Sequence, residues 1–267
     1  MAHSERLETA LAAAQAAAEV IRHYYEHHGE DMEVRSKSDR SPVTDADVEA
    51  ERTIRRIIAE RYPEHGFYGE ETGRADRDSP FLWLVDPIDG TKSFVRRYPF
   101  FSTQIALMEQ GELVLGVSSA PAFGELAWAE KEQGAWLDGE RIRVSAVDAL
   151  ADAAVSSGNL RSLALSGRWP AWGEVVAGAD RIRGYGDFYH YHLLASGCID
   201  AVVESDVNIL DIAALAVIVR EAGGVFTDLS GAPPGLDTTT VLAANPGLHG
   251  LLRRMLDWPS GAAGGSG

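Results

Sequence analysis

The stretch Phe81-Leu-Trp-Leu-Val-Asp-Pro-Ile-Asp-Gly-Thr91 joins an apolar run to two aspartates three positions apart. The run 81–85 is bounded by turn residues, which is typical of a buried β-strand. Asp86 and Asp89 follow directly, so the end of a rigid strand would hold two carboxylates near one point. The proline between them restricts the backbone, and Gly90 permits a tight turn. Carboxylate oxygens without neighbouring His or Cys indicate Mg²⁺ rather than zinc, and a turn capped by aspartates is the alternative.

Three further acidic elements lie outside this stretch. Glu70 and Glu71 follow a predicted strand, and adjacent carboxylates repel each other unless they are solvated or hold a cation. Asp47 lies in the first turn of a predicted helix, where an acidic side chain also suits the helix dipole. Asp211 lies one residue inside another predicted helix, among apolar neighbours. A carboxylate in such surroundings needs a partner, and a metal ion is one such partner.

Helix and strand patterns alternate along the rest of the chain. Apolar residues at helical spacing predict helices at 5–26, 45–61, 188–196, 210–222 and 246–257. Short apolar runs between turn residues predict strands at 65–68, 81–85, 102–109, 112–120, 125–130, 135–144, 153–157, 199–204, 225–228 and 240–244. We expect an N-terminal α+β half, 1–145, with most candidate metal ligands, and a C-terminal α/β half, 146–259, with Asp211. Residues 260–267 are expected to form a flexible tail or an expression remnant.

The composition excludes several classes of protein. The 267 residues include 24 Lys and Arg against 40 Asp and Glu, a formal net charge of −16. Nucleic acids and anionic membranes attract basic surfaces, so neither is an expected partner. The single cysteine, Cys198, argues against a disulfide framework, and its apolar neighbours predict a small core residue. No run of about 18 apolar residues and no targeting signal is present, so we expect a cytoplasmic protein.

Together and in this order, the acidic elements resemble the inositol monophosphatase-like superfamily of Mg²⁺-dependent phosphomonoesterases. The resemblance rests on Gly-Glu-Glu at 69–71, Asp-Pro-Ile-Asp-Gly-Thr at 86–91, and Asp211 followed by Glu-Ala-Gly-Gly at 221–224. It covers nearly the whole chain and implies an α/β protein, an αβαβα five-layer sandwich, that forms a homodimer. One position departs from the pattern, because Leu210 stands where most members have Trp before the last aspartate.

The resemblance also implies roles for individual residues. The implied ligands of two or three Mg²⁺ ions in each active site are Glu70, Asp86, the main-chain carbonyl of Ile88, Asp89 and Asp211. Thr91 would contact the first ion and, with Glu71, orient or deprotonate the attacking water, and Asp47 would reach a weakly held third ion. The N–H groups of Gly90 and Thr91 would bind the phosphate. Lys37 lies on a loop that folds over the site in this family.

The alcohol end of the substrate is indicated by a different part of the chain. The stretch Gly184-Tyr-Gly-Asp-Phe-Tyr189 and the run 207–215 resemble the histidinol-phosphatase branch, whereas inositol phosphatases have a small residue where Asp187 falls. Histidinol phosphate carries an ammonium and an imidazole, so Asp187 and Glu204 would suit it electrostatically. The resemblance therefore implies hydrolysis of L-histidinol phosphate to L-histidinol and phosphate, a step of histidine biosynthesis, by metal-activated water.

Two alternatives stay open. An inositol-1-monophosphatase, or a related polyol or sugar phosphatase, would use the same metal ligands, and Glu204 alone would suit either alcohol. A non-catalytic regulator that binds RNA or the transcription machinery belongs to another class, and the complete ligand set and the charge of −16 argue against it. For Asp187 itself, a solvated turn residue is the alternative. The histidines are not expected to bind metal, because an all-oxygen set is already present.

Overall fold

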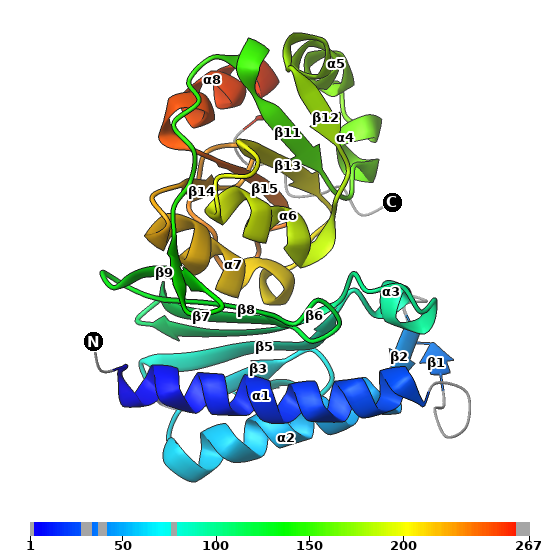
Figure 1. The fold of residues 1–267 in the computed structure, drawn as a ribbon, viewed down its shortest axis with the longest axis vertical. Helices are drawn as coiled ribbons and strands as arrows, with labels where there is room; N and C mark the ends of the chain where they lie inside the picture. Colours follow the sequence, from blue (N-terminus) through cyan, green and yellow to red (C-terminus); the bar gives the residue numbers. More distant parts are fainter. Residues whose placement is uncertain (1–2, 28–33, 37–41, 76–78, 260–267) are drawn as a thin grey trace.

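The chain folds into alternating layers of helix and sheet (Figure 1). The structure, a computed structural model, describes residues 3–27, 34–36, 42–75 and 79–259. Lys37, predicted to lie on a loop over the site, is outside the described residues. The helices of the three helical layers are α1 (Glu5–Glu26) with α2 (Asp45–Arg61), α6 (Asp187–Ala195) with α7 (Ile209–Glu221), and α4 (Arg161–Leu165) with α5 (Trp169–Gly178) and α8 (Pro246–Leu256). The predicted αβαβα sandwich is confirmed.

Two sheets separate these helical layers. The first has eight strands in the order β10-β9-β8-β7-β6-β5-β3-β4, and the second has five in the order β12-β11-β13-β15-β14. The first is built from β3 (Gly66–Gly69), β4 (Gly73–Ala75), β5 (Phe81–Asp89), β6 (Ser102–Glu109), β7 (Glu112–Ala120), β8 (Glu125–Glu130), β9 (Gly134–Leu137) and β10 (Glu140–Ile142). The second is built from β11 (Ala154–Ser157), β12 (Arg181–Arg183), β13 (Ala201–Ser205), β14 (Val225–Thr227) and β15 (Thr240–Ala244). Strands β1 (Val34–Ser36) and β2 (Pro42–Thr44) form a separate pair.

Strand β5 is apolar on both faces because it is covered on both. Trp83 and Val85 pack into the core under α1 and α2, and Leu84 packs into the core around α7. A strand with two buried faces needs a continuous apolar run rather than an alternating one, which explains the sequence of this strand. A third core lies between the second sheet and helices α5 and α8, with Val203 and Leu248 among its buried residues.

Most predicted elements are present, and the departures are short. The helices predicted at 5–26 and 45–61 have the predicted bounds, and the strand predicted at 81–85 continues through the acidic motif to Asp89. Short elements were not predicted because their runs carry too little periodicity. They are β1, β2, β4, the 3₁₀ turn η1 (Leu150–Asp152), α4, α5 and β12. Among the residues that the structure describes, no helix has the length and apolar character needed to cross a bilayer.

The prediction that Cys198 is a core residue is wrong, because its side chain is exposed. It lies in the turn after α6, where Gly197 takes a positive φ of 72° and the backbone leaves the core. The apolar run around Cys198 therefore belongs to a helix end and a strand start rather than to one buried element.

Helix α7 lies directly on strand β7. A Cβ at Gly116 would overlap the carbonyl oxygen of Ala214 and would lie 2.8 Å from its Cα. Contacts of that length do not occur between packed side chains and backbone, so only glycine permits this approach. Since α7 also carries Asp211 in its first turn, the contact sets the height of that carboxylate above the sheet.

The variant Gly116→Ala is therefore expected to be destabilised by about 1–3 kcal/mol, the range for overpacking in a close-packed interior. Urea denaturation followed by circular dichroism measures the change. Gly167→Ala is the matched control, because a Cβ there meets no atom within 4 Å and the residue does not need a positive φ. Equal midpoints for the two variants would contradict the close packing of α7 on β7.

A buried polar chain fixes α6 to the first sheet. His192 Nδ1 lies 3.0 Å from Glu125 Oε2 of β8, and its Nε2 lies 2.9 Å from Ser118 Oγ of β7. Gln104 Nε2 in turn donates to Ser118 Oγ at 3.0 Å. Both ring nitrogens of His192 are thus engaged by protein groups, and the helix that begins with Asp187 is held in register with the sheet below.

Candidate metal centre and active site

Two parallel strands bring the first acidic residues together. Strands β3 and β5 pair with Gly69 opposite Val85, and the Glu70 N–H donates to the Val85 carbonyl at 3.1 Å. Glu70 and Asp86 are the next residues of the two strands. Because the carboxyl ends of parallel strands meet at one edge of a sheet, these carboxylates emerge side by side.

The segment from Asp86 to Gly90 is held in one conformation. The pairing of β5 with β6 shifts register between Asp86 and Asp89, which is the geometry of a β-bulge and re-aims the side chains. The carboxylate of Asp86 accepts the Ile88 N–H at 3.0 Å. Gly90 has a φ of 87°, and a Cβ there would lie 2.5 Å from the Phe100 carbonyl oxygen. Both observations require glycine at this position.

Three carboxylates from different segments converge beyond this bulge. Asp86, Asp89 and Asp211 each place an oxygen within 4.8 Å of the other two. Burial raises the pKa of Asp86, as do the neighbouring charges of Glu70, Asp89 and Asp211. Burial and nearby carboxylates also raise the pKa of Asp89, and burial raises the pKa of Asp211 to about 7. Anionic groups so placed repel one another unless protons or a cation offset their charge.

These oxygens fit a hard divalent cation. Asp89 Oδ2 is buried and has no hydrogen-bond partner among the described residues. Asp86 is only 2% exposed, and Asp211 is anchored by the Asn208 N–H at 3.0 Å in the capping box of α7. Oriented carboxylates with a spare lone pair are the donor set of Mg²⁺ or a similar ion. Of the predicted metal ligands, the structure thus brings together Glu70, Asp86, Asp89 and Asp211.

Thr91 links Asp47 to the Ile88 main-chain carbonyl, which is the remaining predicted metal ligand. Its Oγ1 lies 3.0 Å from the Ile88 carbonyl and 3.3 Å from Asp47 Oδ1, so the single hydroxyl hydrogen has two acceptors to choose from. Asp47 Oδ2 accepts the Thr44 N–H at 2.7 Å in the capping box of α2. Asp47 therefore caps the helix with one oxygen and faces the site with the other, so its two predicted roles are compatible.

Glu51 was missed by sequence reasoning. It is fully buried, and its two oxygens accept the N–H groups of Glu71 and Thr72 at 2.7 and 2.9 Å. A Cβ at Gly69 would lie 2.5 Å from the Glu51 carboxyl carbon, so the turn is moulded around this side chain. The available signal was its position four residues after Asp47, on the inward face of α2, where an acidic residue is out of place.

The predicted alcohol-side residues lie beside the same acidic cluster. A cavity of about 20 Å³ is lined by Asp89, Asp187, Tyr191, Glu204 and Asp211 together with Asn159, Val207, Ile212 and Leu215. Asp187 begins α6 with a positive φ of 46°. Burial, and then the charge of Glu204, raises the pKa of Asp187 to about 6. Asp187 is therefore a half-buried member of an acidic pocket rather than a fully solvated turn residue.

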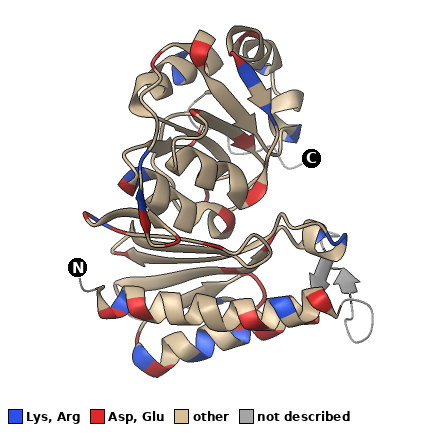
Figure 2. Ribbon diagram, in the orientation of Figure 1, with Lys and Arg blue, Asp and Glu red and all other residues tan. Residues whose placement is uncertain are grey.

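Leu210, which stands where most members of the family have Trp, does not line this cavity. Leu210 is buried in the core around α7, and the cavity wall next to Asp211 is made by Ile212 and Leu215. Most of the other acidic residues lie outside this site. Figure 2 shows that Asp and Glu are interspersed with Lys and Arg along helices α1 and α2.

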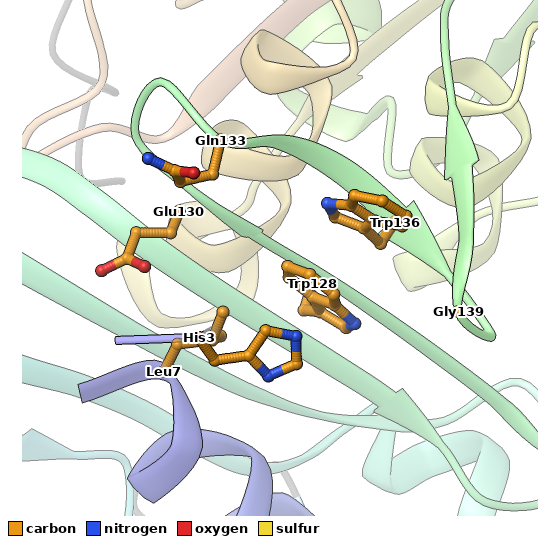
Figure 3. A pocket seen from close by; sticks show the side chains of 7 residues that line it. All are labelled: His3, Leu7, Trp128, Glu130, Gln133, Trp136 and Gly139. Atoms are coloured by element: carbon orange, nitrogen blue, oxygen red, sulfur yellow. The ribbon is translucent and has the colours of Figure 1, made fainter. Parts of the chain in front are cut away.

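A second hollow, of about 300 Å³, lies beside the start of α1 (Figure 3). Trp128 and Trp136 are cross-strand partners whose rings stack at a centroid distance of 5.3 Å, and His3 packs its ring edge-on against Trp128. Glu130 is the one carboxylate in its lining, and it already accepts the Ser4 hydroxyl at 2.6 Å. This hollow offers aromatic packing for the start of α1 and lacks the clustered acids of the first site.

Comparison with known proteins identifies the family. The model of the inositol monophosphatase family matches residues 2–257. The chain belongs to the inositol monophosphatase family. The histidinol-phosphatase of Streptomyces coelicolor is 39% identical over 82% of this chain and 85% of its own length. The inositol-1-monophosphatase of Rhizobium meliloti is 34% identical over 86% and 88% of the two chains.

A solved structure has a similar fold. The extragenic suppressor protein suhB of Bartonella henselae matches with a TM-score of 0.87 at 32% identity, over 95% of this chain and 98% of that one. The predicted family resemblance is confirmed, and the chain is a phosphatase of the inositol monophosphatase family.

The electrostatics of this phosphatase predict how its stability depends on pH. An aspartate has a pKa near 3.8 when unperturbed, whereas burial raises that of Asp211 to about 7 in the fold. Between these values the folded metal-free protein binds more protons than the unfolded chain, so this contribution to stability is lost as the pH rises through about 7. We expect the metal-free protein to melt at a lower temperature at pH 8 than at pH 6.

Added Mg²⁺ should reverse this loss. At 100 times its dissociation constant, a ligand of the folded state contributes about 2.7 kcal/mol, or about 5–10 °C in melting temperature for a chain of this size. The rise should be larger at pH 8 than at pH 6, because protons compete with the ion for the carboxylates. Calorimetry in EDTA and in Mg²⁺ measures both effects. A metal-free protein that is more stable at pH 8 would contradict the account.

Proposed function

We propose that this chain is a Mg²⁺-dependent histidinol-phosphatase, which hydrolyses L-histidinol phosphate to L-histidinol and phosphate in histidine biosynthesis. The observation that carries the proposal is the half-buried carboxylate of Asp187, which lines the same cavity as Asp89 and Asp211. A carboxylate at the alcohol end suits a substrate with an ammonium and an imidazole. Opposite a neutral polyol, the same carboxylate would lose hydration without gaining a cationic partner, which costs binding free energy. The relative of S. coelicolor named histidinol-phosphatase supports the same substrate.

In this proposal the carboxylates of Glu70, Asp86, Asp89 and Asp211 and the Ile88 carbonyl hold two or three Mg²⁺ ions. Mg²⁺ bound by these residues would neutralise the charge of the phosphate, lower the pKa of a coordinated water and stabilise the leaving alkoxide. The orphaned Asp89 Oδ2 and the raised pKa values of these carboxylates favour the assignment.

The chain's own groups orient the reactants. The Thr91 hydroxyl directs its hydrogen toward the Ile88 carbonyl or Asp47, which leaves its oxygen lone pairs available to a water molecule. Glu71 would accept the proton of that water, and Glu51 holds the Glu71 backbone in place. The N–H groups of Gly90 and Thr91 open helix α3 (Thr91–Val95) and would donate to the phosphate oxygens.

At the other end of the ester, Asp187 and Glu204 would bind the cationic alcohol. Lys37, which is outside the described residues, would also contact the substrate. We further propose that the protein is a homodimer and is located in the cytoplasm. Inositol 1-phosphate, or a related polyol or sugar phosphate, is the second candidate substrate. It is favoured by the relative of R. meliloti and by the fit of Glu204 to a hydroxyl group.

The proposal is tested by phosphate release from L-histidinol phosphate and from inositol 1-phosphate in separate assays, each with Mg²⁺ and then with EDTA. We expect rapid release from L-histidinol phosphate with Mg²⁺ and none with EDTA. Release that persists in EDTA would exclude the metal mechanism, and preference for the inositol ester would exclude the substrate. Size-exclusion chromatography with light scattering tests the homodimer.

A further inference from the structure

Glu204 is held on several sides by protein groups. It lies at the C-terminal end of strand β13 and is 3% exposed. Its side chain lines the cavity that also contains Asp187. Its Oε1 accepts the Asn159 N–H at 3.1 Å. Gly158 has no side chain where the Glu204 carboxylate lies, and a Cβ there would overlap it. The carboxylate is therefore seated in a fitted recess and does not sample many rotamers.

The other oxygen of Glu204 meets two side chains of helix α6. Tyr191 donates its hydroxyl hydrogen to Oε2 at 2.9 Å, and His190 Nε2 lies 3.2 Å from the same oxygen. The other nitrogen of the His190 ring, Nδ1, lies 3.3 Å from Ser156 Oγ. His190 and Ser156 are fully buried and Tyr191 is 1% exposed, so solvent does not compete for these contacts.

The Tyr191 phenol remains a donor at working pH. Burial raises the pKa of Tyr191 well above its ordinary value, and the negative charge of Glu204 raises it further. A neutral phenol beside a carboxylate forms a charge-assisted hydrogen bond, which is stronger than one between neutral groups. The ring of Tyr191 also lines the cavity, so the same side chain forms part of the wall and orients the acid.

We propose that Tyr191 is a positioning residue for substrate recognition, which holds the Glu204 carboxylate in the orientation that meets the alcohol end of the phosphate ester. This inference rests on the proposed function in placing the alcohol end of a phosphate ester beside Glu204, and it applies to either candidate ester. Tyr191 acts before the chemical step, because its hydroxyl contacts Glu204 and not the acids proposed to bind metal. Its removal should weaken substrate binding and leave the rate of hydrolysis of the bound ester nearly unchanged.

The test compares Tyr191→Phe with Tyr189→Phe in the holoenzyme. Tyr189 is on the same helix, its ring stacks on Phe123, and it does not line the cavity. The assay uses whichever of L-histidinol phosphate and inositol 1-phosphate the wild type hydrolyses faster. For Tyr191→Phe we expect KM to rise about tenfold, as for loss of a hydrogen bond to a charged group, with kcat within twofold. Tyr189→Phe should leave both constants unchanged.

A double-mutant cycle with Glu204→Ala separates positioning from a general structural effect. If Tyr191 acts through Glu204, Tyr191→Phe adds less than a twofold change in KM when Glu204 is already alanine and no acceptor remains for the Tyr191 hydroxyl. A melting temperature within a few degrees of the wild type shows that the variants are folded. An unchanged KM in Tyr191→Phe, or a fully additive effect in the double variant, would overturn the inference. Failure of the proposed function is a separate result, since it is read from which ester the wild type prefers.

Discussion

Replacement of Asp89 by asparagine is expected to lower phosphate release by about 10³-fold or more and to raise the melting temperature of the metal-free protein. The two effects have one cause. Asp89 is a half-buried carboxylate with one buried oxygen, and its pKa is raised by burial and by nearby acids, so its charge destabilises the fold when no cation is bound. The same charge is what would hold Mg²⁺, and an amide lacks it.

The measurement is phosphate release with Mg²⁺, combined with calorimetry in EDTA at pH 8. Asp211→Asn and Glu70→Gln should abolish turnover in the same way, with little loss of fold. Asp180→Asn is the matched control, because Asp180 is exposed between α5 and β12 and should change neither quantity. Activity retained in Asp211→Asn and Glu70→Gln would contradict the metal assignment, and a lower metal-free melting temperature in Asp89→Asn would contradict the electrostatic account.

The second large effect concerns substrate choice. Asp187→Asn is expected to lower kcat/KM for L-histidinol phosphate by about 10–100-fold, the range for losing a hydrogen bond between charged groups. A phosphate ester with an uncharged alkyl alcohol should lose less than about threefold, because it presents no cation to the acid. The measurement is kcat/KM for both esters in both proteins.

Asparagine is the appropriate substitution at this position. Asp187 has a φ of 46°, in the left-handed region that aspartate and asparagine tolerate better than alanine. Asp187→Ala is also expected to damage turnover of L-histidinol phosphate more than that of the neutral ester, but it adds backbone strain to the loss of charge. Equal losses with both esters would remove Asp187 from substrate recognition.

The first site elements were predictable because each is local in the chain. The apolar run 81–85 indicated a buried strand, and each of the two acidic motifs was predicted to follow directly after a strand. The structure brings Glu70 and Asp86 together through the pairing of Gly69 with Val85. Asp211 could not be joined to them by local pattern, and only the resemblance to a known family supplied that connection.

The remaining features depend on contacts between distant segments. Glu51 looks like any acid on a charged helix until the turn after Gly69 is placed over it. The Tyr191–Glu204 hydrogen bond needs both the placement of α6 and the end of β13. Cys198 was misplaced for the opposite reason, since its local run is apolar but the turn at Gly197 carries it to the surface. The spacing of apolar and polar residues along the chain does not predict such contacts between distant segments.

The central claim is that a cationic alcohol is selected at a metal-dependent phosphatase site. Its most direct test offers L-histidinol phosphate and inositol 1-phosphate to the enzyme in one mixture with Mg²⁺ and measures the two alcohols released. The ratio of initial rates at equal concentrations equals the ratio of the kcat/KM values and does not depend on enzyme concentration. We predict that L-histidinol is released about 100-fold faster or more, as expected for one or two added charge-assisted contacts. Equal release, or faster release of inositol, would contradict the account.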